Sequence, residues 1–273
     1  MNASVAVLLI VLDGIPRSDA FNPALFPHLN ALRAQGTTLL LQTGNPSGVS
    51  LPGYADLFTG HRQGTITGND SAGLHSLEPT LFERAQERFG GHDSVAVVAS
   101  WEPLCALAVV KEPPPRATFY RSCGVVDAPH YRPGLDGTRA DVDTFIEAME
   151  VLERRPRLLF VQFKNGDSQA HLVASVRNGS HVDLGRTGYE GELRKMDFYV
   201  GAIVEKARTT GPVRVVVTTD HGRSAADWTG HGADEESLQS WAIVVGDGAS
   251  RAHASTLAEI AVMVAEWIGL VAH

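Results

Sequence analysis

The sequence predicts an α/β fold with a largely parallel central sheet and helices on both faces. Continuous apolar segments rich in β-branched residues, such as residues 4–12, are typical of strands that are covered on both sides. Helical segments lie between these strands, and this alternation implies right-handed crossovers. At 273 residues, with 44% hydrophobic and 20% charged residues, the chain can bury a substantial core, and we expect residues 1–273 to form a single domain.

The first half of the chain begins with the strand at residues 4–12. Residues 29–35 are expected to form a helix that Gly36 ends, with Pro27 near its start. The next predicted elements are a strand (37–41), a loop rich in Gly, Asn, Pro and Ser (43–49), a helix from residue 50 or 51 to 58, a helix (81–89) and a strand (95–99).

Residues 101–138 differ from the rest of the chain, because they contain many prolines and glycines and little periodicity. We expect a loop-rich excursion over the rim of the sheet that is too small for a second domain. The second half then returns to alternation. Its predicted elements are a helix (141–154), a strand (158–163), a helix (190–209), strands (213–219 and 241–245) and a closing helix (256–268).

Charge and cysteine content restrict the partners and the compartment. A net charge of −8 argues against stable nucleic-acid binding through phosphate contacts. The apolar run at residues 5–12 is too short to span a membrane and lacks the features of a signal peptide. A cytoplasmic location without a membrane partner is therefore expected. Cys105 and Cys123 are then expected to be free thiols, with one disulfide as the alternative.

Acidic residues follow three of the most apolar predicted strands. Asp13 comes directly after the first strand, Asp220 follows residues 213–219, and Asp167 lies shortly after residues 158–163. Ligands of such sheets bind beyond the carboxyl ends of the strands. Histidines accompany these acids, namely His171, His221 and His231.

Three carboxylates gathered at one rim would repel one another, and divalent cations would relieve that repulsion. Mixed Asp/His ligation suits zinc best, with manganese or iron as alternatives, whereas calcium prefers oxygen ligands alone. Six protein ligands are enough for two metal ions. Two such ions, roughly 3.5–4 Å apart, can clamp the attacking and leaving oxygens of an in-line displacement.

Ser50 follows the turn-rich loop and stands at the start of a predicted helix. Two interpretations remain open at this point. As an N-cap, its hydroxyl would satisfy backbone N–H groups. Beside a metal ion, the same hydroxyl would be a nucleophile, because the ion lowers its pKa.

The order of these motifs resembles that of the alkaline phosphatase superfamily of metallohydrolases, and in particular its nucleotide pyrophosphatase/phosphodiesterase branch. The resemblance runs from Asp13 to His231. It is carried by Asp13, Ser50-Leu51-Pro52-Gly53-Tyr54, Thr59-Gly60, Asp167-x-x-x-His171, Asp220-His221-Gly222 and His231.

The resemblance implies an alkaline-phosphatase-like fold and a role for each motif residue. Asp13, Asp220 and His221 would hold one zinc ion beside the nucleophile Ser50, and Asp167, His171 and His231 would hold the other. Asn69 would help to bind a non-bridging phosphate oxygen. The implied activity is hydrolysis of a small-molecule phosphate ester through a covalent phosphoserine, with diesters favoured over monoesters.

Some departures from the superfamily matter for this interpretation. Tyr54 stands where sulfatases carry an arginine, which disfavours a sulfatase. No arginine matches the phosphate-binding arginine of the phosphomonoesterases, and Arg62, Lys164 and Arg223 are expected to be solvated. The alternatives are a phosphotransferase or mutase, a sulfatase or phosphonate hydrolase, and an inactive metal-stabilised binding protein. The oligomeric state is not indicated.

Overall fold

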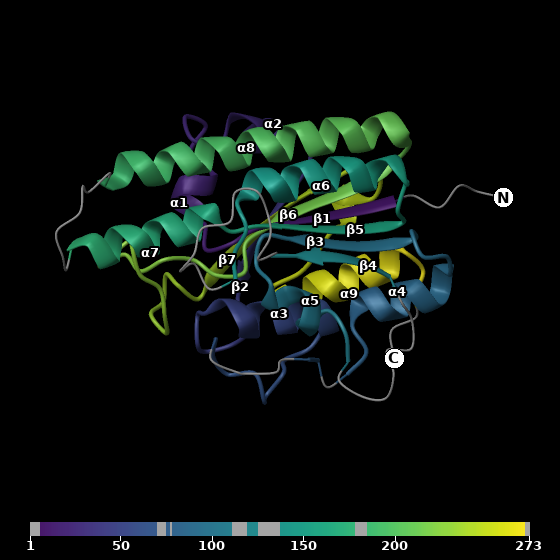
Figure 1. Cartoon of the computed structure of the whole chain (residues 1–273), viewed down its shortest axis with the longest axis horizontal. Coiled ribbons are helices and arrows are strands. Elements are labelled where there is room, and N and C mark those ends of the chain that lie inside the picture. Colours follow the sequence, from purple (N-terminus) through teal and green to yellow (C-terminus); the bar gives the residue numbers. More distant parts are fainter. Residues whose placement is uncertain are drawn as a thin grey trace.

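A mostly parallel sheet runs through the centre of the molecule (Figure 1). The structure, a computed structural model, describes residues 6–69, 75–76, 78–110, 119–124, 137–177 and 185–270. Within these ranges the sheet has seven strands in the order β2-β7-β6-β1-β5-β3-β4. They are β1 (Ala6–Leu12), β2 (Thr37–Gln42), β3 (Val95–Ala99), β4 (Tyr120–Cys123), β5 (Leu158–Phe163), β6 (Val213–Thr218) and β7 (Gln239–Val245). The predicted fold class is confirmed.

The first strand, β1, occupies the middle of this sheet. It pairs in parallel with β5 on one side, where Val7 aligns with Leu158, and with β6 on the other, where Ala6 aligns with Val213. The β3 strand pairs in parallel with β5, and β4 pairs in parallel with β3. Among the described strands, β7 alone runs opposite to the other six, since it is antiparallel to both β6 and β2.

Helices cover both faces of the sheet (Figure 1). They are α1 (Arg17–Ala20), α2 (Pro27–Arg33), α3 (Ser50–Thr59), α4 (Leu81–Phe89), α5 (Pro103–Leu107), α6 (Asp141–Glu153), α7 (Asn165–Arg177), α8 (Gly185–Thr210) and α9 (Leu257–Trp267), with a short 3₁₀ turn at Ala249–Arg251. Figure 1 shows α3, α4, α5 and α9 on one side and α2, α6 and α8 on the other. This is the doubly covered sheet that the apolar strands predict.

The alternation of side chains along β1 joins the sheet to both helical layers. Val7, Leu9 and Val11 belong to the hydrophobic cluster on the side of α3 and α9. Leu8 and Ile10 belong to the cluster on the side of α2 and α8. Because successive side chains of a strand point to opposite faces, a strand buried on both sides must be apolar throughout.

The excursion at residues 101–138 is more regular than expected. Its described part contains the short helix α5 and the edge strand β4, which extends the sheet beyond β3; residues 111–118 and 125–136 lie outside the described ranges. The sequence also missed α7, which begins directly after β5. Its residues show no clear apolar periodicity, because the first turns of α7 carry polar residues such as Asp167 and Gln169.

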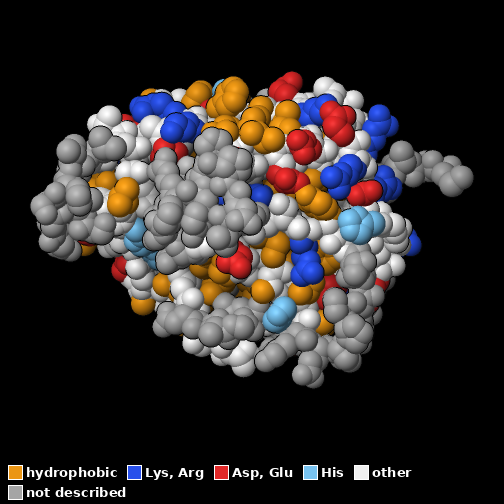
Figure 2. Space-filling view, in the orientation of Figure 1, with side chains coloured by type: hydrophobic (Ala, Val, Ile, Leu, Met, Phe, Trp, Pro, Cys, Tyr) orange, Lys and Arg blue, Asp and Glu red, His pale blue; other side chains and the backbone are white. Residues whose placement is uncertain are grey.

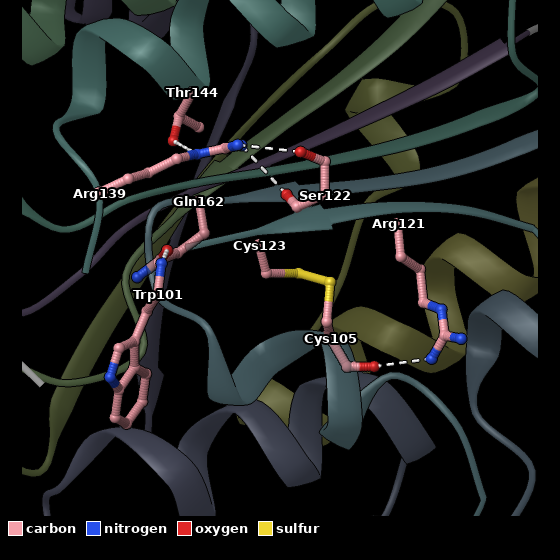
Figure 3. The surroundings of a disulfide bond; sticks show 8 residues. All are labelled: Trp101, Cys105, Arg121, Ser122, Cys123, Arg139, Thr144 and Gln162. Atoms are coloured by element: carbon pink, nitrogen blue, oxygen red, sulfur yellow. Dashed lines mark hydrogen bonds between the residues drawn. A yellow bond between two sulfur atoms is a disulfide. The ribbon is translucent and has the colours of Figure 1, made fainter. Parts of the chain in front are cut away.

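The expectation of free thiols is wrong, because Cys105 and Cys123 form a disulfide (Figure 3). Cys105 lies on α5 and Cys123 ends β4. The pairing of β4 with β3 brings the two Cα atoms to 5.6 Å, which is within the range that a disulfide needs. The sequence could not show this proximity, since neither α5 nor β4 was predicted.

Loss of this disulfide is expected to lower the free energy of unfolding by about 3 kcal/mol. The bond joins residues that are 18 apart in sequence, and a closed loop of this size removes a comparable entropy from the unfolded chain. Urea unfolding with and without reductant measures the effect. A variant with both Cys105→Ser and Cys123→Ser is the control, because its unfolding should not respond to reductant. An unfolding midpoint of the unaltered protein that ignores the reductant would contradict the prediction.

The surface carries some exposed apolar side chains, and Figure 2 shows hydrophobic groups over α6 and α8. Ile146 on α6 is 49% exposed and Phe198 on α8 is 56% exposed. Among the described residues, no helix combines the length and the apolar character that crossing a membrane requires.

Candidate metal centre

Three adjacent strands deliver the acidic residues to one edge of the sheet. Asp13 follows β1, Asp220 follows β6, and Asp167 lies in the first turn of α7, directly after β5. The fold gathers the six predicted ligands into two groups, in each of which the potential ligand atoms lie within 4.8 Å of one another. The first cluster is Asp13, Asp220 and His221, and the second cluster is Asp167, His171 and His231.

The first cluster is fully buried and contains a carboxylate oxygen that has no hydrogen-bond partner in the part of the chain that the structure describes. The backbone N–H of Gly14 donates to Asp220 Oδ1 at 2.9 Å, whereas Asp220 Oδ2 makes no hydrogen bond among the described residues. Burial and the neighbouring Asp13 raise the pKa of Asp220 well above its usual value. A buried, unpartnered carboxylate oxygen is costly, and a divalent cation at this position would remove that cost. The cluster therefore fits a metal ion.

Protein donors orient Asp13 so that one of its oxygens faces the site. Asp13 Oδ2 accepts hydrogen bonds from the hydroxyl of Tyr54 at 2.9 Å and from Nε2 of Gln162 at 3.0 Å. Burial and Asp13 raise the pKa of Tyr54 well above its usual value, so Tyr54 stays neutral and donates. Asp13 Oδ1 is then left to face the site, as expected of a ligand whose surroundings fix its orientation.

The imidazoles of His221 and His231 are oriented by backbone carbonyls. Nδ1 of His221 lies 2.8 Å from the carbonyl oxygen of Gly222, and Nδ1 of His231 lies 2.8 Å from that of Gly48. Since a carbonyl only accepts, each Nδ1 carries the proton and each Nε2 presents a lone pair. Burial lowers the pKa of His221, and burial together with His221 lowers that of His231 to about 3. Both rings are neutral at physiological pH, as metal ligands must be.

The second cluster brings two imidazole nitrogens together beside a carboxylate. His171 Nε2 lies 3.0 Å from His231 Nε2 and 3.3 Å from Asp167 Oδ1. Asp167 and His171 are four residues apart on α7, so they share one face of the helix. Because the Nε2 lone pair of His231 points at this position, a cation bound by all three side chains would hold them together. This cluster fits a metal ion as well.

Ser50 is the first residue of α3, and its hydroxyl faces the first cluster. Ser50 Oγ lies 3.4 Å from Asp13 Oδ1 and 3.2 Å from His221 Nε2. Val49 occupies the N-cap position, and no side-chain hydrogen bond caps the helix from there. The structure therefore does not use Ser50 as an N-cap. The interpretation of Ser50 as a nucleophile stays a prediction.

Asn69 lies beside the same helix start. Its Oδ1 accepts a hydrogen bond from the backbone N–H of Leu51 at 2.9 Å. The amide thereby satisfies one of the free N–H groups at the start of α3. The structure thus brings Asn69 to the start of α3, where Ser50 also lies.

Lys164 and Arg223 are buried, so the expectation that they are solvated is wrong. Lys164 is 7% and Arg223 3% exposed, whereas Arg62 lies on the surface as expected. Lys164 Nζ lies 3.1 Å from Asp13 Oδ1 and 2.9 Å from Asp167 Oδ2. Arg223 forms an ion pair with Asp167. Long cations are buried only when they are paired, and here the carboxylates of Asp13 and Asp167, which follow β1 and β5, supply the partners.

These cations change the charge state of the second cluster. Burial alone would raise the pKa of Asp167, but Lys164 and Arg223 hold it well below its usual value. Burial likewise opposes the charge of Lys164, yet Asp13 and Asp167 raise its pKa. Asp167 is therefore an anion, and Lys164 a cation, over the whole physiological range.

Asp141, at the start of α6, positions the segment between β5 and α7. Its carboxylate accepts hydrogen bonds from the backbone N–H of Lys164 at 2.8 Å and from that of Asn165 at 2.9 Å. Ser100 donates to the same carboxylate at 2.6 Å. Burial raises the pKa of Asp141 to about 6. The residue fixes the turn that presents Lys164 and Asp167.

Comparison with known proteins identifies similar sequences and folds. Residues 7–263 match the family model of type I phosphodiesterase / nucleotide pyrophosphatase, while no curated protein matches the chain significantly. A 2-O GAG sulfatase has a TM-score of 0.70 at 14% identity, over 99% of this chain and 72% of that chain. The C-terminal periplasmic domain of EcEptC from Escherichia coli, in complex with Zn, has a TM-score of 0.62 at 13% identity, over 98% and 83%. A protein in the alkaline phosphatase superfamily from Vibrio parahaemolyticus has a TM-score of 0.64 at 12% identity, over 98% and 67%.

Proposed function

Because the chain belongs to the type I phosphodiesterase / nucleotide pyrophosphatase family, we propose that it hydrolyses small phosphate esters with Ser50 as the nucleophile and two metal ions as cofactors. The family predicted from the order of the motifs is confirmed. The observation that carries the proposal is the position of Ser50 Oγ, 3.2 Å from His221 Nε2 and 3.4 Å from Asp13 Oδ1 in the first cluster. A hydroxyl in such surroundings is poised for activation.

The first cluster would hold one ion and the second cluster the other, with zinc preferred for the mixed Asp/His ligands and manganese or iron as alternatives. Ions bound there would lower the pKa of the Ser50 hydroxyl and neutralise negative charge on the phosphoryl group. Tyr54 and Gln162 hold Asp13 in place for this, and the carbonyls of Gly48 and Gly222 hold the two imidazoles.

The reaction proceeds in two displacements at phosphorus. In the first, the bond between Ser50 Oγ and phosphorus forms while the bond to the leaving ester oxygen breaks, and the released alcohol takes up the proton that Ser50 gives up. In the second, water attacks the phosphoserine, and the serine oxygen recovers a proton as it leaves. Two inversions give net retention at phosphorus. The Nδ2 group of Asn69 would donate to a non-bridging oxygen, so that the protein supplies position and fixed charge.

Diesters are favoured as substrates by the motif at the start of α3 and by the family. At 14% identity, the structural likeness to a sulfatase shows the fold alone. Tyr54, which stands where sulfatases carry an arginine, donates its hydrogen bond to Asp13. A sulfatase, a phosphonate hydrolase, a phosphotransferase and an inactive metal-binding protein remain the alternatives.

A substrate panel tests this proposal. The zinc-loaded protein is assayed with bis(4-nitrophenyl) phosphate, 4-nitrophenyl phosphate, 4-nitrophenyl sulfate and 4-nitrophenyl phenylphosphonate. We expect the highest kcat/KM for the diester, a lower value for the monoester and no turnover of the sulfate. Turnover of the sulfate alone would contradict the proposal, as would two bound metal ions without activity on any of the four esters.

The disulfide bears on the predicted cytoplasmic location. The cytoplasmic location stays a prediction, and the Cys105–Cys123 bond counts against it, because disulfides persist mainly in oxidising compartments.

A further inference from the structure

Lys164 is a buried cation that lies between the two candidate metal clusters. Its ammonium group donates to Asp13 of the first cluster and to Asp167 of the second cluster, and the side chain is only 9% exposed. The oxygen that it contacts on Asp13, Oδ1, is the same atom that Ser50 Oγ contacts. The ammonium group and the Ser50 hydroxyl therefore share one carboxylate oxygen as a partner.

The surroundings of Lys164 limit its movement. The ammonium nitrogen lies 4.5 Å from the centre of the Trp101 ring, a favourable contact between a cation and the face of an indole. The backbone N–H of Trp101 donates to Gln162 at 3.1 Å (Figure 3), which in turn holds Asp13. At the backbone of Lys164, the carboxylate of Asp141 accepts a hydrogen bond from the N–H. Because Lys164 is held at both ends, its ammonium group can contact only atoms close to its present position.

Bound metal ions would change the charge balance around the ammonium group of Lys164. Asp13 and Asp167 would then each share their charge with a divalent ion, and Lys164 would add a further positive charge beside two others. The two ions and Lys164 would together carry more positive charge than Asp13, Asp167 and Asp220 offset, so an anion bound among the three cations is favoured. An ammonium group has three N–H donors, and among the described residues Lys164 uses two of them for hydrogen bonds.

We propose that Lys164 is a catalytic residue whose ammonium group binds a non-bridging oxygen of the phosphoryl group attacked by Ser50, and that it favours phosphoryl groups with two negative charges over those with one. This rests on the proposed function. Lys164 would thereby take the role of the phosphate-binding arginine of the phosphomonoesterases, for which this sequence has no match. A monoester carries one more negative charge than a diester, so the same ammonium group stabilises it more. The diester can remain the better substrate, while the residual monoester activity depends on Lys164.

Substitution of Lys164 separates this role from a role in holding the carboxylates. Lys164→Met keeps the length of the side chain, and Lys164→Gln keeps a donor without the charge. For both variants we expect two metal ions per chain and a fall in kcat/KM for 4-nitrophenyl phosphate that exceeds the fall for bis(4-nitrophenyl) phosphate by about tenfold or more. Gln162→Met is the matched control, because it removes an uncharged partner of the same Asp13 and should lower both activities equally.

A structure of the unaltered, zinc-loaded protein with inorganic phosphate gives a second test that does not depend on activity. We expect Lys164 Nζ within about 3 Å of a phosphate oxygen. The proposal is overturned if Nζ stays on Asp13 and Asp167 without a phosphate contact, or if the variants lose both ester activities in equal proportion. If the unaltered protein cleaves no ester but Lys164 contacts phosphate, the proposed function fails while the assignment of Lys164 as a phosphoryl ligand survives.

Discussion

Replacement of Ser50 by alanine is expected to abolish phosphate ester turnover, with a fall in kcat of about 10³-fold or more, because it removes the hydroxyl that would form the covalent bond to phosphorus. Among the described residues, Ser50 is the hydroxyl residue that contacts both Asp13 and His221. Metal content should stay unchanged, since Ser50 belongs to neither cluster. Turnover of bis(4-nitrophenyl) phosphate and metal analysis of the same preparation measure both effects.

Ser47→Ala is the matched control for this substitution. Ser47 lies in the loop that leads to α3, but its hydroxyl donates to Asn45 and not to the site, so full activity is expected. Acid quenching of the unaltered enzyme during turnover should trap a phosphoryl group on Ser50, which mass spectrometry of the peptide detects. Full activity of the Ser50→Ala variant would exclude Ser50 as the nucleophile.

Removal of the metal ions is expected to have an equally large effect. A chelator should abolish turnover, and zinc should restore it, because without the ions nothing would lower the pKa of the Ser50 hydroxyl or neutralise charge on the phosphoryl group. Asp220→Asn removes the unpartnered carboxylate of the first cluster. We expect this variant to lose one of the two ions and to lose turnover by about 10³-fold.

Asp56→Asn is a control for the loss of a buried carboxylate as such. Asp56 is buried on α3 and burial raises its pKa to about 6, but it belongs to neither cluster. We expect the variant to keep two metal ions and its activity. Full turnover of the unaltered protein after exhaustive chelation, with no metal detected, would show that the clusters do not take part in the reaction.

The acidic residues of the site could be predicted from the sequence because their positions depend on the strands that directly precede them. Asp13 and Asp220 follow apolar strands directly, and in a parallel sheet the carboxyl ends of strands meet at one edge. What the sequence does not reveal is that β5, β1 and β6 are neighbours in the sheet. This adjacency makes two compact clusters of residues that could otherwise have been spread along the rim.

Residues that act through long-range contacts were missed, although two of them carried a signal. Tyr54 lies four residues after Ser50 on α3, so it shares the face of the helix that meets Asp13. Gln162 is a polar residue in the otherwise apolar strand β5 and is fully buried, and a buried polar group requires a partner. A buried polar residue in a strand next to an acidic motif is therefore a candidate for a residue that orients a metal ligand.

Lys164 and Arg223 offered no comparable signal. A basic residue near a motif is usually solvated, and only the folded chain brings Asp13 and Asp167 together around Lys164. The disulfide between Cys105 and Cys123 was hidden for a related reason, since it depends on an edge strand formed by a segment rich in proline and glycine.

Anomalous X-ray diffraction at the zinc edge, from crystals of the zinc-loaded protein, tests the metal centre most directly. Two peaks roughly 3.5–4 Å apart are expected, one bound by Asp13, Asp220 and His221 beside Ser50, and the other by Asp167, His171 and His231. Peaks held by other side chains, or the absence of bound zinc in protein that cleaves the diester, would contradict the assignment of these six residues as the ligands.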